Sequence, residues 1–164
     1  MTLLRPAEPR DLAAIAALQR DAILALAGGA YGQAGVEAWA RWQEADAATL
    51  LGQDGAFFVV QDTVDETLLA VGGWRPDGQA ATLAWVRAVF VAPRAARRGV
   101  GRLTMEAIER SCRTSGRRDL ALSASLNAEG FYARLGYTPL SRGTWTVEPG
   151  IALGYVRMRK GATA

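Results

Sequence analysis

The sequence has no histidine, one cysteine and one lysine, and each shortage excludes a class of chemistry. Without histidine, neither a Ser-His-Asp nor a Cys-His nucleophilic arrangement can be built. Since Cys112 is the sole thiol, we expect no internal disulfide, no metal site and a reducing, cytoplasmic location. A P-loop is also excluded, because Lys160 lies far from any glycine-rich turn. Acid–base chemistry must therefore use tyrosine, carboxylates, the cysteine, the N-terminus or water.

Long apolar runs are missing as well. No stretch approaches the roughly 18 residues of a membrane span, and the first six residues lack the pattern of a secretory signal. The net charge of +3, from 19 basic and 16 acidic residues, is modest for a nucleic-acid-binding protein. We therefore expect neither a membrane nor a nucleic acid as partner. The length of 164 residues, half of them apolar, predicts a single domain over residues 1–164.

Hydrophobic periodicity predicts strands and helices in the order β-α-α-β-β-β-α-β-α-β-β. We expect Asp11 to cap the first helix, Gly28-Gly29 to end it, and residues 143–150 to form a loop. The expected strands are residues 2–6, 56–61, 68–74, 81–91, 120–124, 137–141 and 152–158, and the later helices are residues 34–44, 99–113 and 128–135.

The most informative segment is residues 89–102, an apolar strand, an arginine-rich loop and a glycine-bearing helix start. The first turn of a helix has backbone N–H groups without intrahelical partners and a partial positive charge, so it can hold a phosphate or pyrophosphate. Gly99 and Gly101 would let a ligand approach the main chain. The alternative is a plain turn into a surface helix, but that does not explain four arginines around one turn: Arg94, Arg97, Arg98 and Arg102.

This segment resembles the coenzyme A pyrophosphate loop of the GNAT superfamily of acyl-CoA-dependent N-acetyltransferases, usually written Gln/Arg-x-x-Gly-x-Gly/Ala. Gly99 and Gly101 match, whereas Ala96 departs from the first position. The resemblance implies acetyl-CoA as cofactor and an α/β (α+β) fold, with a twisted mixed sheet of about seven strands flanked by about four helices. The cofactor-binding residues that it implies here are Val89, Phe90, Val91, Arg97, Arg98, Gly99, Val100, Gly101 and Arg102.

A second segment, residues 123–137, resembles the other GNAT signature, Asn…Phe-Tyr-x-x-x-Gly-Phe. The resemblance places Tyr132 beside the thioester sulfur, where a neutral phenol can protonate the leaving thiolate. The alternative is that Tyr132 only fills the core. The asparagine position falls on Ser125, seven residues before the tyrosine, while Asn127 lies five before it. Either could bind the pantetheine arm, or Asn127 could cap the helix that follows.

These observations predict direct transfer of an acetyl group from acetyl-CoA to a primary amine in a ternary complex. Aromatic residues in the regions that shape the family's amine pocket favour a small-molecule acceptor: Tyr31, Trp39, Trp42 and Trp145. A protein N-terminus or lysine as acceptor, and a non-catalytic acyl-CoA-binding module, are the alternatives. A homodimer is possible. The general base stays open among Glu37, Glu44, Asp46 and a water relay. We expect Cys112 to be buried and structural, because it shares a helical face with Ile108.

Overall fold

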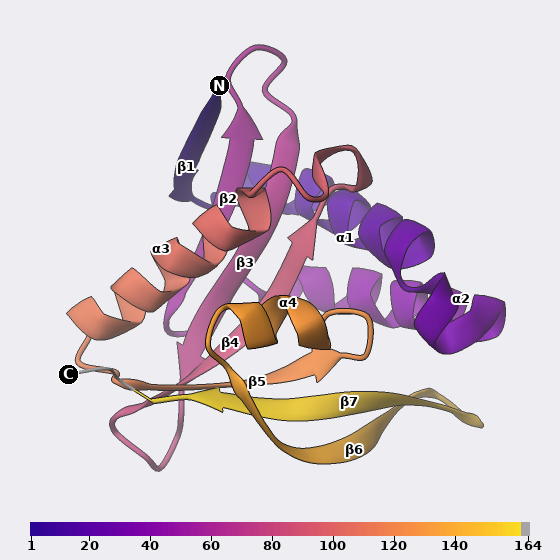
Figure 1. Cartoon of the computed structure of the whole chain (residues 1–164). Helices are drawn as coiled ribbons and strands as arrows, with labels where there is room; N and C mark the ends of the chain where they lie inside the picture. Colours follow the sequence, from indigo (N-terminus) through magenta and orange to yellow (C-terminus); the bar gives the residue numbers. More distant parts are fainter. Residues whose placement is uncertain (162–164) are drawn as a thin grey trace.

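The fold is built on one seven-stranded mixed sheet, described by a computed structural model over residues 1–161, without the side chain of Ala45. The strand order is β1-β2-β3-β4-β5-β7-β6, and only β4 and β5 run parallel (Figure 1). The expected sheet of about seven strands is confirmed. The strands are β1 (Thr2–Pro6), β2 (Ala56–Asp62), β3 (Leu68–Pro76), β4 (Leu83–Val91), β5 (Asp119–Ser125), β6 (Thr138–Glu148) and β7 (Ile151–Lys160).

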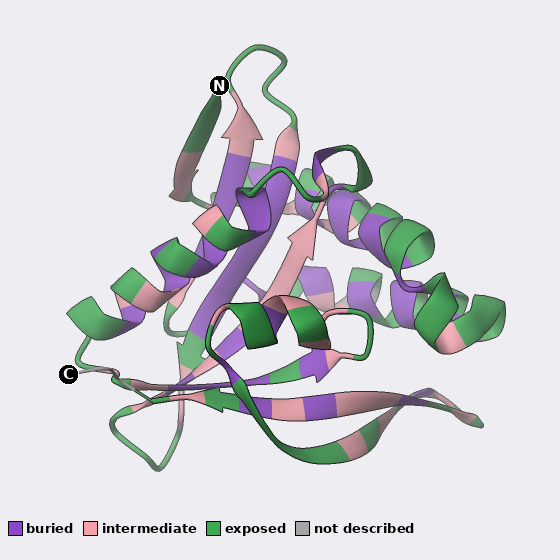
Figure 2. Ribbon diagram, in the orientation of Figure 1, coloured by how far each residue is buried: buried purple, intermediate pink, exposed green. Residues whose placement is uncertain are grey.

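Four α-helices cover the two faces of the sheet, α3 and α4 on one side and α1 and α2 on the other (Figure 1). Buried residues run along the centre of the sheet and along the inner sides of α1, α2 and α3, while the outer sides of the helices are exposed (Figure 2). In the described part of the chain, no helix combines the length and apolar character needed to cross a membrane. The helices are α1 (Leu12–Leu26), α2 (Gly28–Asp46), α3 (Val100–Thr114) and α4 (Glu129–Arg134).

Cys112 lies on the inner face of α3, as the sequence predicts. Its exposed fraction is 0%, and it packs with Ile108, Met105 and Trp74 in the core between α3 and the sheet. Burial, with a smaller effect from the neighbouring Glu109, raises the pKa of the Cys112 thiol to about 12. The thiol is therefore protonated at physiological pH and serves as a small apolar side chain.

The expectation of a loop at residues 143–150 is wrong, because β6 continues through most of this segment. Alternating β-branched and apolar side chains, Thr144-Trp145-Thr146-Val147, are a strand pattern that the flanking glycines obscured. Trp145 pairs with Leu153 across the β6–β7 hairpin, which turns at Pro149-Gly150. The extended hairpin brings Trp145 toward the middle of the molecule.

The expected cap of the first helix is also wrong. The Asp11 carboxylate does not cap α1, because it accepts hydrogen bonds from Arg5 at 2.7 and 2.9 Å and from the Glu8 N–H at 2.8 Å. α1 ends at Leu26, just before Gly28-Gly29 as expected, but α2 begins at Gly28 instead of residue 34 and is interrupted at Gly32, whose φ is +70°. The favourable ion pair and the tight α1–α2 junction are tertiary contacts that local propensity does not report.

The sheet divides between β4 and β5. Their pairing ends at Trp85 and Ala121, although β4 continues to Val91 and β5 to Ser125 (Figure 1). On its other side β4 carries a β-bulge: Val71 pairs with Phe90 and Gly73 with Arg87, so two residues of β4 stand opposite one residue of β3. The bulged Ala88 has a φ of +53°. A bulge increases local twist and frees backbone groups, and here it accompanies an open wedge between the two parallel strands.

The close contact between β2 and β3 depends on Gly73. A Cβ at this position would lie 2.3 Å from the backbone oxygen of Ala56. We therefore expect Gly73→Ala to destabilise the fold by about 2–3 kcal/mol through overpacking, measured by urea unfolding. Gly78→Ala is the control, since a Cβ at Gly78 meets nothing within 4 Å. Equal stability of the two variants would contradict this account of the sheet.

Candidate active site

Two cavities meet at the wedge between β4 and β5. The first, here called the α3 cleft, has a volume of about 420 Å³ and lies between the start of α3, the end of α1 and α4. The second, here called the α2 cavity, has a volume of about 610 Å³ and lies between α2, β4 and the β6–β7 hairpin. Six residues line both: Trp39, Val89, Phe90, Ser125, Ala128 and Tyr132. A ligand in the α3 cleft can therefore touch a ligand in the α2 cavity at this junction.

The start of α3, which lines the α3 cleft, has a backbone geometry that can accept an anion. Gly99 precedes the helix with a φ of +83°, and no side chain caps the first turn. The first backbone N–H groups of α3 have no carbonyl of the same helix to donate to, because no helical turn precedes them. The helix dipole adds a partial positive charge at the same place. Most of the predicted cofactor residues line this cleft: Val89, Phe90, Val91, Arg97, Gly99, Gly101, Arg102, Ser125 and Asn127.

The side chains of three residues of this loop do not line the cleft, so any contribution of theirs to cofactor binding stays a prediction. Val100 is only 7% exposed and packs into the core beside β3, and Arg98 lies outside the cleft lining. Arg94 is directed to Asp65, 3.7 Å away, and does not line the cleft. Val100 is the first residue of α3, whereas Arg94 and Arg98 lie in the turns that precede the helix. Of the arginines in the loop and at the start of α3, Arg97 and Arg102 line the cleft, and Arg134 of α4 lines it from the other side.

The sequence missed the far wall of the cleft, which the end of α1 supplies. Ile23 and Ala27 are buried there, and Leu26 is exposed to 44% because it faces the cleft. The exposed leucine at a helix end is the one signal that could have indicated a ligand wall. These residues lie about 70 positions from Gly99, so only the packing of α1 against β4 brings them to the site.

Tyr132 lies on α4, at the junction of the two cavities. Its ring packs against Phe131 and Tyr137, with centroid separations of 5.1 and 5.8 Å. Within residues 1–161 no side-chain hydrogen bond engages its hydroxyl, and burial raises the pKa of the phenol above its usual range. The group is therefore neutral and keeps its proton available to a ligand.

Ser125 and Asn127 both line the α3 cleft. The capping alternative for Asn127 is wrong, because α4 starts after Ala128 and no side chain caps it. The Ala128 N–H donates instead to the Ser125 carbonyl at 2.9 Å. This turn after β5 points both polar residues at the wedge.

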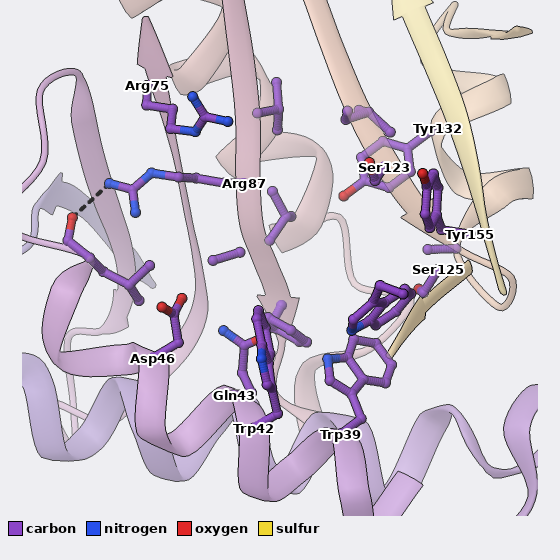
Figure 3. A pocket seen from close by; sticks show the side chains of 18 of the residues that line it. Trp39, Trp42, Gln43, Asp46, Arg75, Arg87, Ser123, Ser125, Tyr132 and Tyr155 are labelled. Atoms are coloured by element: carbon purple, nitrogen blue, oxygen red, sulfur yellow. Dashed lines mark hydrogen bonds between the residues drawn. The ribbon is translucent and has the colours of Figure 1, made fainter. Parts of the chain in front are cut away.

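Aromatic side chains line the α2 cavity, as the sequence predicts for three of the four residues considered. Trp39, Trp42 and Tyr155 of β7 are in its wall (Figure 3). Trp145 of β6 also lines it. Tyr31 stays outside: its hydroxyl donates to the Gly154 carbonyl at 2.7 Å and accepts from the Leu126 N–H at 2.8 Å. Tyr31 therefore holds α2 against β7 and the turn after β5.

Of the three carboxylates considered as general base, only Asp46 lines the α2 cavity. The Glu37 carboxylate is exposed and accepts a hydrogen bond from Gln33 at 2.7 Å, and Glu44 is exposed outside the cavity. Across the described residues, no group of three or more histidine, cysteine or carboxylate side chains is placed to hold a metal ion.

A profile of the acetyltransferase (GNAT) domain matches residues 29–161, most of the chain and all of the wedge. The chain belongs to the GNAT acetyltransferase family. The structure of this enzyme is similar to the GCN5-related N-acetyltransferase of Rhodopseudomonas palustris, with 26% identity, a TM-score of 0.83 and coverage of 98% of this chain and 96% of that one.

Two more distant structures share the fold of the enzyme. The PaiA N-acetyltransferase of Thermoplasma acidophilum, solved with coenzyme A, is 17% identical, with a TM-score of 0.76 and coverage of 98% and 99%. YncA of Salmonella typhimurium, solved with its cofactor acetyl-CoA, is 18% identical, with a TM-score of 0.67 and coverage of 100% and 95%. No curated protein matches the enzyme in sequence.

The geometry of the α3 cleft predicts that Gly99→Val removes most of the affinity for coenzyme A. The valine would strain the left-handed backbone and place a branched side chain at the helix start. Gly116→Val is a matched control, since Gly116 has a φ of +79°, equally open surroundings and a place beyond the other end of α3. Calorimetric titration with coenzyme A compares the two, and equal affinities would contradict this placement.

Proposed function

We propose that the enzyme transfers the acetyl group of acetyl-CoA directly to the primary amine of a small molecule, in a ternary complex. Family membership makes it an acetyltransferase that acts with acetyl-CoA. The observation that carries the rest is the junction of the two cavities at Tyr132. One cavity suits the cofactor and the other the acceptor, so both reactants can meet without a covalent enzyme intermediate.

In this proposal the backbone of the α3 cleft holds the cofactor. The N–H groups around Gly99 and Gly101 bind the pyrophosphate, with Arg97 and Arg102 adding charge at the rim. Val89, Phe90 and Val91 follow the pantetheine arm along the unpaired end of β4, and Ser125 and Asn127 face it from the other side of the wedge. The wedge replaces strand pairing with a ligand that runs between the strands.

Acetyl-CoA supplies an acetyl thioester, whose carbonyl carbon accepts the amine and whose sulfur leaves as a thiolate. At the bulge of β4, backbone N–H groups near Ala88 are released from the ladder and can stabilise the charge that develops on the carbonyl oxygen. The neutral Tyr132 phenol donates its proton toward the leaving sulfur. Holding both reactants in line supplies much of the acceleration.

The acceptor amine would enter through the α2 cavity. Its volume of about 610 Å³ matches a small molecule rather than a folded surface. Asp46 stands in the wall and can take up the proton of the amine through a water chain.

The primary test is acetyl-CoA-dependent thiol release over a panel of amines that includes small molecules and a lysine- and N-terminus-bearing peptide. We expect turnover with small amines and intersecting initial-velocity lines, as direct transfer requires. Turnover confined to the peptide would replace the small-molecule acceptor with a protein one.

Tyr132→Phe keeps the ring and removes its only proton. General acid catalysis contributes about 10²–10⁴-fold, and the raised pKa of the phenol reduces its acidity, so we expect kcat to fall toward the lower end, about 10²-fold. Affinity for acetyl-CoA and the melting temperature should change little.

Tyr137→Phe is the matched control for Tyr132→Phe. It removes a hydrogen bond from the Tyr137 hydroxyl to Glu109 at 3.1 Å and lies outside both cavities. It should lose about 1 kcal/mol of stability with little change in kcat. If both variants kept the wild-type kcat while chemistry limits the rate, Tyr132 would be a packing residue only.

Direct transfer also predicts that Cys112→Ala keeps full activity, because the buried, protonated thiol cannot attack a thioester. Removing the sulfur should cost about 1 kcal/mol of stability by leaving a small cavity. Steady-state kinetics and thermal melting check both effects. An acetyl group trapped on Cys112 by mass spectrometry would overturn the mechanism.

A further inference from the structure

The α2 cavity carries an excess of positive charge. Its wall contains three arginines, Arg75, Arg87 and Arg157, and one carboxylate, Asp46, which gives three positive charges minus one, a net charge of +2. Among residues 1–161, no ion pair within 4.0 Å involves any of these three arginines, whereas Arg5, with Asp11 at 2.7 Å, is an example of one that is paired. Within the described residues, the cavity therefore holds three cations that form no ion pair with a carboxylate of the protein.

Arg87 is the most informative of the three. Its Nη2 donates to the Leu50 carbonyl at 2.7 Å, while its Nε is buried and has no acceptor among the described residues. Burial lowers the pKa of Arg87, Asp46 raises it by a smaller effect, and the like charge of Arg75 lowers it again. A half-buried guanidinium that has lost part of its hydration and has no carboxylate partner is disfavoured in its charged form. A countercharge from a ligand would offset that cost.

Aromatic rings hold these guanidinium groups in place. Arg157 lies 4.6 Å from the Trp85 ring and 5.4 Å from the Tyr155 ring, Arg75 lies 5.9 Å from Trp85, and Arg87 lies 5.7 Å from Phe57. A guanidinium that stacks on a ring keeps its N–H groups free for an oxyanion. The arginines are thus oriented before any ligand arrives, which reduces the entropy lost on binding.

Two of the three arginines lie away from the reacting end of the cavity. Figure 3 shows Arg75 and Arg87, with Asp46 below them, on one side of the cavity and Tyr132 with Ser123 on the opposite side. Arg157 pairs with Ser123 across β5 and β7, and its guanidinium lies over the Trp85 ring that Arg75 also approaches. An acceptor that spans this space would place one end at the wedge and the other at the arginines. A cationic far end would be repelled by the net positive charge.

We infer that the acceptor is a primary amine that also carries an anionic group such as a carboxylate, as an amino acid does. The amine lies at the wedge beside Tyr132, and the anion binds to Arg87 with Arg75 and Arg157 near it. This inference rests on the proposed function, because it assigns the α2 cavity to the acceptor. The inference narrows the proposed acceptors of the α2 cavity from amines in general to amines that are zwitterionic or anionic.

The test compares matched acceptors that differ only in the anion. L-phenylalanine and L-methionine are each assayed against their primary amides and their decarboxylated amines by acetyl-CoA-dependent thiol release. A hydrogen-bonded charge contact predicts a kcat/KM about 10- to 100-fold higher for the carboxylate member. Neutral members that react as well as or better than the carboxylates would overturn the inference while leaving the proposed function intact.

Variants of the arginines locate the effect. Arg87→Met should lower the carboxylate-to-amide ratio of kcat/KM toward one, mainly through KM, and Arg87→Lys should restore part of it. Arg75→Met provides the same test at an exposed position, should Arg87→Met fail to fold. Arg159→Met is the control, because Arg159 lies on the same strand as Arg157 but is exposed, 3.7 Å from Asp119 and outside the cavity. An unchanged ratio in both cavity variants would contradict the assignment.

A binding measurement separates this inference from the proposed function. Calorimetry compares N-acetyl-L-phenylalanine with its primary amide on the coenzyme A complex, which needs no turnover. Tighter binding of the carboxylate by about 10-fold or more, lost in Arg75→Met, supports the anion site even if no amine in the panel releases thiol. Equal affinities for the two ligands overturn it, whatever the amine assay shows.

Discussion

The separation of β4 from β5 is the constraint on which the rest of the site depends. Two parallel strands that start as hydrogen-bonded neighbours at Leu83 and Asp119 stop pairing three residues later. Their remaining backbone groups would be costly to leave unpaired in the interior, so the wedge is stable only if a ligand or solvent fills it. The bulge in β4 and the glycines of β3 accommodate the twist that this separation requires. The candidate active site thus lies where the pairing of the sheet is interrupted between β4 and β5.

The wedge also gives the proposed reaction two separate entrances, one for each reactant. α3 begins where β4 ends, so its N-terminus faces one mouth of the wedge, while α2 and the β6–β7 hairpin enclose the other. α4 contributes Tyr132 from the end of β5, at the point where both cavities meet. No single element contains the site. Each element contributes one boundary, and the arrangement of the sheet sets the distances between them.

Burial sets the electrostatic character of the three groups that matter most. It keeps the Tyr132 phenol protonated, keeps the Cys112 thiol inert and leaves the Arg87 guanidinium without full compensation. The first effect suits a proton donor, the second removes a competing nucleophile, and the third favours an anionic ligand. Burial disfavours the charged form of each side chain. For Tyr132 and Cys112 it stabilises the neutral form that the proposed reaction needs, whereas for Arg87 it leaves a charge that a ligand can neutralise.

The sequence by itself determined the order of the elements, the glycine-marked helix start and the identity of Tyr132, because these depend on short spacings and local backbone chemistry. Gly99 and Phe131-Tyr132 are recognisable without any knowledge of their neighbours. Only the tertiary structure decided which side chains line the two cavities. Arg75, Arg87 and Tyr155 lie on three different strands, and no local pattern distinguishes them from other surface or core residues. Hydrophobic periodicity reports which face of an element is buried, but what that face contacts is set by packing between segments distant in the chain.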